Sequence, residues 1–287
     1  MLGRADLKPP VLLDGGLGTE LMRRGMGAGE STIVQNIENP QLVSEIHTAY
    51  IEAGCRVITA NTFGGNIAAL RKAGKAELEE RANVQGMRLA RQSAAGKALV
   101  AADIGPTGEF YAREFNYQKI KEIFIRQAEI LMQEPPDLFL LETFFDLREA
   151  LAALEGVKEM CGEIPAGVSL TYNKRLRGYF TVMGDAAAAA TQRLQAAGAD
   201  IAGSNCNLTP AEMLDLAREL KASAGIPVII QPNAGQPEIE GDKIVYRMTA
   251  EEFAEGMARI AAEGVEFIGG CCGSTPEIIK AGIRILG

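Results

Sequence analysis

The chain has 287 residues, of which 47% are hydrophobic and 23% are charged, and its formal net charge is −8. These proportions are typical of a globular protein and exclude the disordered and fibrous classes. The negative charge argues against a nucleic-acid partner, because phosphate binding needs clustered Lys and Arg. No apolar stretch is long enough for a membrane span and the amino terminus lacks a signal peptide's apolar core, so we expect a cytoplasmic protein without a membrane partner.

Short apolar runs rich in β-branched residues recur along the chain and predict eight strands, at residues 11–14, 56–60, 98–103, 137–142, 166–170, 200–204, 227–231 and 265–269. Most are separated by segments with the spacing of an amphipathic helix, such as residues 40–54, 117–133, 209–225 and 249–264. Strands that alternate with helices pair in parallel. Eight such units predict an α/β fold, a (β/α)8 TIM barrel, as a single domain over residues 1–287. After the fifth strand, residues 172–184 are expected to form an elaborated loop or a hairpin.

Polar side chains stand at the carboxyl ends of most predicted strands. Asp14, Asp103 and Glu142 end the first, third and fourth strands; the later ends carry Asn61, Thr62, Asn205, Cys206, Asn233, Cys271 and Cys272. The strands of a parallel barrel all point the same way, so these side chains gather at one mouth, where barrel enzymes carry their chemistry. We therefore predict that this mouth is the functional site.

Three of the five cysteines belong to this mouth. An odd number of cysteines in a large chain without an export signal favours free thiols or metal ligation over disulfides. Cys206, Cys271 and Cys272 could offer three thiolates and leave a fourth position open, which is typical of a catalytic zinc site.

Adjacent residues of a strand point to opposite faces, so the neighbours Cys271 and Cys272 need unusual backbone dihedral angles to reach one ion. Gly269, Gly270 and Gly273 are expected to supply this freedom. A strained vicinal disulfide and two ordinary buried cysteines are the alternatives.

The remaining cysteines and the single histidine are expected outside the site. Cys55 and Cys161 fall in or near predicted helix ends, where small buried hydrophobes are the favoured interpretation. His47 lies within an amphipathic helix and is expected to be a packed or surface residue. A histidine-dependent catalytic triad and a zinc site built on histidine are thereby nearly excluded.

The first loop, DGGLGTE at residues 14–20, is glycine-rich and enters a helix. It lacks the third glycine of a dinucleotide fingerprint, and no Gly-Lys-Ser/Thr follows. Its backbone N–H groups suit a small anion such as a carboxylate, while Asp14 and Glu142 suit an ammonium group. An amino acid carries both groups. Helix capping or loop hydrogen bonding is the alternative role for each acid.

Seven motifs resemble the homocysteine S-methyltransferase family over about residues 11 to 280: DGGLGTE, TANTFGGN, DIGPTG, LLETFFD, GSNC, QPNAG and GGCCG. The family includes betaine–homocysteine methyltransferase and the substrate-binding module of cobalamin-dependent methionine synthase. The resemblance implies a (β/α)8 barrel in which Cys206, Cys271 and Cys272 bind Zn²⁺ and the metal takes the thiolate of homocysteine. It further implies that Asp14 and Glu142 hold the substrate's amino group. Its carboxylate is expected at the backbone N–H groups of Gly15, Gly16, Leu17, Gly18 and Thr19.

We therefore expect zinc-dependent methyl transfer to homocysteine, with methionine as the product. The QPNAG and GGCCG segments look more like the methionine synthase module, so the expected donor is methylcobalamin on a partner corrinoid protein. The chain has no Trp, which disfavours the aromatic cage that binds betaine. S-methylmethionine or betaine as the donor, another thiol as the acceptor, and a non-catalytic zinc- or redox-responsive barrel protein are the alternatives.

Overall fold

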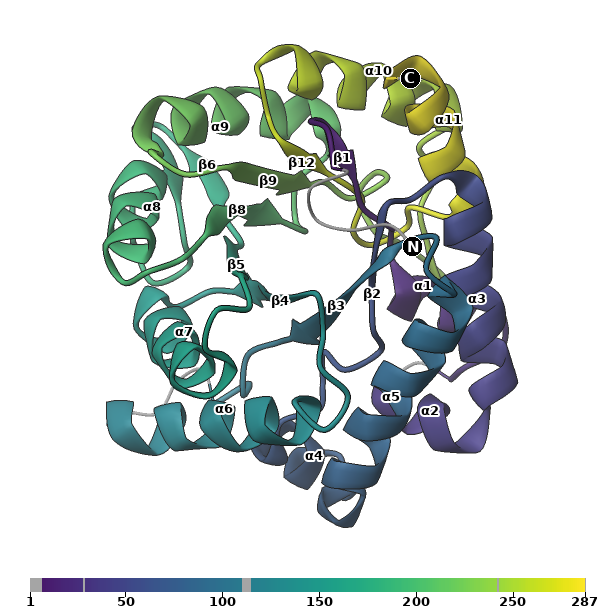
Figure 1. The fold of residues 1–287 in the computed structure, drawn as a ribbon. Helices are drawn as coiled ribbons and strands as arrows, with labels where there is room; N and C mark the ends of the chain where they lie inside the picture. The colour runs from purple at the N-terminus through teal and green to yellow at the C-terminus, as the bar shows by residue number, and fades with distance from the viewer. Residues whose placement is uncertain (1–6, 28, 110–114, 242, 287) are drawn as a thin grey trace.

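A closed barrel of parallel strands organises the molecule. The computed structural model describes residues 7–27, 29–109, 115–241 and 243–286. One eight-stranded sheet runs in the order β1-β12-β9-β8-β5-β4-β3-β2, and a parallel bridge between Leu13 and Val57 joins its two edges (Figure 1). The strands are β1 (Val11–Leu12), β2 (Val57–Thr59), β3 (Leu99–Ile104), β4 (Leu138–Phe144), β5 (Ala166–Leu170), β8 (Ile201–Asn205), β9 (Val228–Gln231) and β12 (Phe267–Ile268). The predicted (β/α)8 barrel and all eight predicted strands are confirmed.

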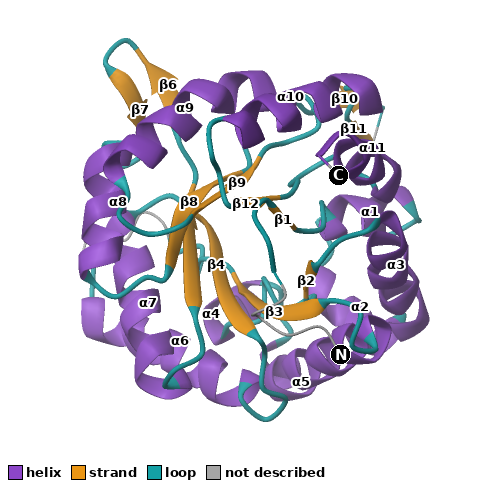
Figure 2. Cartoon of the chain, turned by 45° about the horizontal axis from the view of Figure 1, so that its top comes forward, coloured by secondary structure: helices purple, strands orange, loops and turns teal. Residues whose placement is uncertain are grey.

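Helices surround the barrel on its outside, as Figure 2 shows. They are α1 (Leu17–Arg23), α2 (Gln35–Glu38), α3 (Pro40–Ala53), α4 (Ile67–Lys72), α5 (Glu79–Ala94), α6 (Tyr117–Leu131), α7 (Leu147–Cys161), α8 (Ala187–Ala196), α9 (Pro210–Ser223), α10 (Ala250–Ala262) and α11 (Pro276–Leu286), with short 3₁₀ turns at Thr32–Val34 and Ala76–Leu78. Sequence signals explain several helix starts. Thr209 and Thr249, which immediately precede α9 and α10, each form a capping box with the Glu three residues later. None of the described helices is long and apolar enough to cross a membrane.

Both faces of the strands are buried, and their alternation separates two cores. Val11, Leu13, Leu99, Ala101, Leu138, Leu140, Ile201 and Ile229 belong to one cluster, which fills the barrel interior. The residues between them, such as Val100 and Leu141, pack in the larger cluster that includes the helices. Strands covered on both faces lack the alternation of apolar and polar residues that marks a half-exposed strand. Period-2 geometry nevertheless decides which residues at the strand ends face the mouth.

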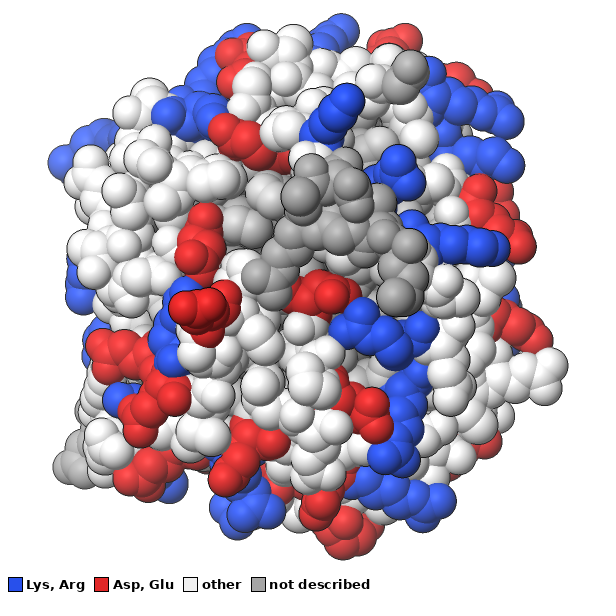
Figure 3. All heavy atoms as spheres, in the orientation of Figure 1, with Lys and Arg blue, Asp and Glu red and all other residues white. Residues whose placement is uncertain are grey.

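A repeated ionic arrangement ties the amino-terminal ends of neighbouring strands together. Asp137, Asp200 and Glu266 each precede a strand and accept a 2.8 Å hydrogen bond from the first or second residue of the adjacent strand. Each also pairs with a cation on the helix before that adjacent strand: Arg91, Lys158 and Lys221, respectively. Figure 3 shows acidic and basic side chains interspersed over one face of the molecule.

Two hairpins project from the barrel. β6 (Asn173–Arg175) and β7 (Gly178–Phe180) pair antiparallel, which confirms the hairpin expected within residues 172–184 (Figure 2). β10 (Glu238–Glu240) and β11 (Lys243–Val245) form a second hairpin that the sequence analysis did not predict. Its apolar side chains are largely exposed, so it has no buried face that would produce a recognisable strand pattern.

Candidate active site

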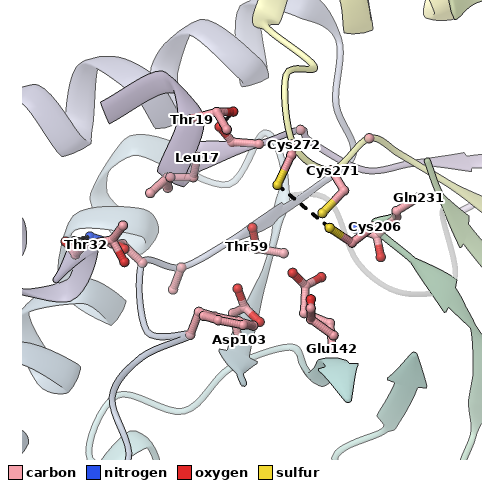
Figure 4. A pocket seen from close by; sticks show the side chains of 18 of the residues that line it. Leu17, Thr19, Thr32, Thr59, Asp103, Glu142, Cys206, Gln231, Cys271 and Cys272 are labelled. Carbon is pink, nitrogen blue, oxygen red and sulfur yellow. Dashed lines mark hydrogen bonds between the residues drawn. The ribbon is translucent and has the colours of Figure 1, made fainter. Parts of the chain in front are cut away.

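A cavity of about 290 Å³ opens at the carboxyl ends of the strands (Figure 4). This volume is near the lower end of the range for small-molecule pockets and suits a ligand of amino-acid size. Its walls come from the first loop and from most of the strand ends, and they include Gly15, Gly16, Leu17, Gly18, Thr19, Met22, Thr32, Thr59, Asn61, Phe63, Asp103, Glu142, Thr143, Cys206, Gln231, Gly270, Cys271 and Cys272.

Cys206, Cys271 and Cys272, here called the cysteine cluster, meet at one side of this cavity. Their three Sγ atoms all lie within 4.8 Å of one another, and those of Cys206 and Cys272 are 3.8 Å apart. Tetrahedral thiolate ligands at about 2.3 Å from a zinc ion lie about 3.8 Å from each other. The cluster therefore fits a single ion of this size, and its soft thiolates are of the type that zinc prefers.

Left-handed backbone turns bring these sulfurs together. Gly273 has a φ of 79°, whereas Gly269 and Gly270 are not among the described residues with positive φ. The expected unusual dihedral angle is therefore confirmed for Gly273, and it stays a prediction for the other two glycines. Cys206 instead has a positive φ of its own, 62°, followed by 63° at Asn207. A non-glycine residue in this region is strained, and such strain concentrates at functional sites.

Buried amides hold the thiols in place. The side chain of Asn205 donates to Thr143 Oγ1 at 2.7 Å and accepts from the Thr143 N–H at 2.8 Å, and its Nδ2 lies 3.8 Å from Cys271 Sγ. Hydrogen bonds from the other two thiols lower the pKa of Cys206 to about 3. Cys206 is therefore the member of the cluster that loses its proton most readily, and the thiolate is the form that ligates metals.

The carboxyl groups of Asp103 and Glu142 lie side by side and turn into the cavity (Figure 4). Burial, and then the charge of Asp14, raises the pKa of Glu142 to about 8. Burial, and then the charge of Glu142, raises the pKa of Asp103 well above its usual range. Two acids in a low-dielectric site favour a cationic ligand, because a positive charge between them offsets both desolvation and repulsion.

Asp14 has different surroundings. It is buried and is not among the described residues that line the cavity. Its carboxylate accepts hydrogen bonds from the Thr59 N–H at 2.7 Å and from Thr59 Oγ1 at 3.1 Å. Burial raises its pKa to about 7. The predicted contact between Asp14 and a substrate ammonium stays a prediction, whereas Asp103, to which the sequence analysis gave no role, lines the cavity.

Strand alternation was the signal that could have singled out Asp103. On β3, Asp103 shares the face of the interior residues Leu99 and Ala101, and on β4, Glu142 shares the face of Leu138 and Leu140. Asp14 follows Leu13, which is itself an interior residue, so it falls on the opposite parity.

The first loop is packed directly against the loop that carries two of the thiols. The amide of Gly16 donates to Ser274 O at 3.2 Å, and the amide of Leu17 donates to Gly15 O at 2.9 Å. Gly18 and Thr19 are the second and third residues of α1, so their N–H groups have no acceptor within the helix. These two amides are therefore better placed to receive a carboxylate than those of Gly16 and Leu17, which already have acceptors.

The residues expected outside the site do lie away from it. Cys55 and Cys161 are buried free thiols, as predicted. His47 is fully buried in α3, neither of its ring nitrogens has a hydrogen-bond partner, and burial lowers its pKa to about 4. It is a neutral core residue.

Fold and site together define a barrel protein with a thiol cluster and a pair of neighbouring carboxyl groups at its mouth. A sequence profile of the homocysteine S-methyltransferase family matches residues 11–284. The chain therefore belongs to the homocysteine S-methyltransferase family.

Known relatives agree with this membership. The methionine synthases of Mycobacterium leprae (strain TN) and Mycobacterium tuberculosis (strain ATCC 25618 / H37Rv) are 30% and 29% identical to it over 93% of this chain. These matches cover 23% and 24% of the relatives, so the chain spans about a quarter of their length. The homocysteine methyltransferase MmuM from Escherichia coli has the same fold. Its metallated form matches with a TM-score of 0.80 and 24% identity over 98% of this chain and 99% of its own; its oxidized form matches with 0.81 and 21% over 99% and 98%.

Proposed function

We propose that this chain transfers a methyl group to the thiol of homocysteine and forms methionine, with Zn²⁺ bound by the cysteine cluster. The observation that carries the proposal is the 3.8 Å spacing of two cluster sulfurs in a cavity whose other side holds two carboxyl groups. Family membership and the names of the relatives, methionine synthase and homocysteine methyltransferase, support this acceptor and product.

Each part of the cavity has a role in this proposal. Zinc, when bound, supplies a Lewis acid that keeps a coordinated thiol deprotonated at neutral pH. Glu142 holds the substrate's ammonium group. Asp14 does not line the cavity, but its buried carboxylate adds negative charge near this group. The amides of Gly18 and Thr19 receive the carboxylate. A substrate held at both ends has its sulfur fixed at the cysteine cluster and presents it to the donor in one orientation.

The donor we propose is a methylated corrinoid protein, because the chain is similar to methionine synthases and resembles the module whose donor is methylcobalamin. Of the described residues that line the cavity, Phe63 alone carries an aromatic ring. A cage for the quaternary ammonium of betaine needs several such rings, so this lining argues against betaine.

A donor screen tests the function and separates the candidates. Zinc-loaded protein is mixed with L-homocysteine and, in turn, a methylated corrinoid protein, free methylcobalamin, S-methylmethionine, betaine, S-adenosylmethionine or methyltetrahydrofolate, and methionine is quantified. We expect turnover with the corrinoid protein. Rapid turnover with betaine or S-methylmethionine would overturn the donor assignment, and no methionine from any donor would argue against the enzyme function.

A further inference from the structure

Asp103 is held in the cavity wall by its backbone and not by its side chain. Its N–H donates to Thr62 Oγ1 at 3.0 Å, and the Thr62 hydroxyl donates to Asp103 O at 2.7 Å. The end of β3 is therefore fixed. The residue is only 7% exposed, and its Oδ1 is buried without a hydrogen-bond partner.

This lack of a partner sets Asp103 apart from the other buried acids of the described chain. Each of those accepts at least one hydrogen bond on its carboxylate: Asp14, Glu20, Glu79, Asp146 and Glu149. A buried carboxyl group without a partner destabilises a fold, and more so beside another acid. No described residue of the surrounding scaffold offsets this cost at Asp103 with a hydrogen bond to Oδ1. Its carboxyl group instead lines the cavity, next to Glu142 (Figure 4).

The missing partner must be a small group that carries positive charge and N–H donors. The cavity of about 290 Å³ has room for one amino acid, and its thiol-binding side is already assigned to the cysteine cluster. An α-ammonium group offers three N–H donors, of which two can reach two separate carboxylates. A thiol acid without the amino group would leave both acids unpaired.

On this basis we propose that Asp103 is a specificity-determining residue, which together with Glu142 restricts the acceptor to thiols that carry a protonated α-amino group. The proposal rests on the function proposed above and adds to it a second recognition residue from β3. Charge-assisted hydrogen bonds are strong enough that loss of one weakens binding about ten- to a hundredfold. A site built for a polar group also rejects an analogue without that group strongly.

The test compares two ligands that differ only in the amino group, L-homocysteine and 4-mercaptobutyrate. Calorimetry measures the Kd of each for zinc-loaded wild-type protein, for Asp103→Asn and for a matched control, Glu149→Gln. The control neutralises another buried acid, one whose carboxylate accepts from the Thr107 backbone and hydroxyl and which does not line the cavity. Zinc content and the melting temperature of each protein without ligand are measured in parallel.

We expect Asp103→Asn to weaken homocysteine binding about ten- to a hundredfold and to leave the Kd of 4-mercaptobutyrate unchanged or lower, so that selectivity falls. Its melting temperature without ligand should not fall below that of wild type, because the carboxyl group that is replaced makes no hydrogen bond to the described scaffold. Glu149→Gln should keep wild-type selectivity.

Several results would overturn the proposal. Homocysteine binding within twofold of wild type in Asp103→Asn would do so, as would a lower melting temperature with equal loss of both ligands, which indicates a structural role. If Asp103→Asn does not fold, the two Kd values of the wild-type protein provide the test. Equal affinity of the wild-type protein for L-homocysteine and 4-mercaptobutyrate would refute the proposal. If wild-type protein binds neither thiol, the proposed function itself is refuted. If wild-type protein binds homocysteine and Asp103→Asn binds it equally well, only this inference is refuted.

Discussion

Gly16 is the position where the smallest change should disturb the cysteine cluster without touching a thiol. A Cβ atom added there would lie 2.6 Å from Cys271 O and 2.5 Å from Thr19 Oγ1. The Thr19 hydroxyl cannot rotate away without loss, because it donates to Gly16 O at 2.8 Å and accepts from the Gly273 N–H at 3.0 Å. The loop of Cys271 must therefore move.

The size of that movement follows from the contact distances. Restoring an ordinary contact of 3.4 Å to Cys271 O requires a shift of about 0.8 Å. Metal–ligand distances can deviate by only about 0.2 Å from their usual values. Gly16→Ala should therefore weaken zinc binding about ten- to a hundredfold, which is the usual effect of disturbing the groups that orient metal ligands. Overpacking should also lower the free energy of unfolding by about 1–3 kcal/mol.

Competition with a chromophoric chelator measures the zinc affinity, and urea unfolding measures stability. Gly64→Ala is the matched control: it lies in the loop after β2, and a Cβ atom there meets nothing within 4 Å. If Gly16→Ala binds zinc as tightly as wild type and Gly64→Ala do, the contact between the two loops does not position the thiols and our reasoning about this loop is wrong.

Three further predictions concern the metal, the substrate and the core. Replacing any member of the cysteine cluster by Ala should abolish bound zinc, measured by plasma mass spectrometry, while Cys161→Ala keeps it; full zinc retention in Cys272→Ala would contradict the site. Glu142→Gln should raise the Kd for homocysteine about ten- to a hundredfold and leave the zinc content unchanged. Loss of zinc with an unchanged Kd would show that Glu142 belongs to the metal site or to the scaffold instead. The folded pKa of His47, about 4, lies below the unfolded value of about 6.5, so its contribution to stability is complete above pH 6.5 and is lost as pH falls. Wild type should therefore lose about 2 kcal/mol more than His47→Leu between pH 7 and pH 5 in urea unfolding, and parallel losses would refute a neutral buried histidine.

Local patterns along the sequence were sufficient for the architecture. Eight apolar runs and the helices between them predicted the barrel, because each strand and helix is recognisable from its own residues and parallel pairing follows from their alternation. The cysteine cluster was also predictable, since all strand ends of a parallel barrel meet at one mouth whatever their separation in sequence. The β10–β11 hairpin was not predicted, because its strands are exposed and bury no face that would produce a recognisable apolar pattern.

Only the tertiary structure decided how the mouth is built. Asp14 and Asp103 each end a predicted strand, but the Thr59 N–H and hydroxyl bind the carboxylate of Asp14, whereas the carboxyl group of Asp103 lines the cavity and its Oδ1 has no partner. Likewise, Gly16 is required by its contact with Cys271, a residue at the other end of the chain. Local sequence determines which elements form, whereas the direction of a side chain at a strand end, and the partner that it meets there, depend on where each strand stops and which distant loop packs against it.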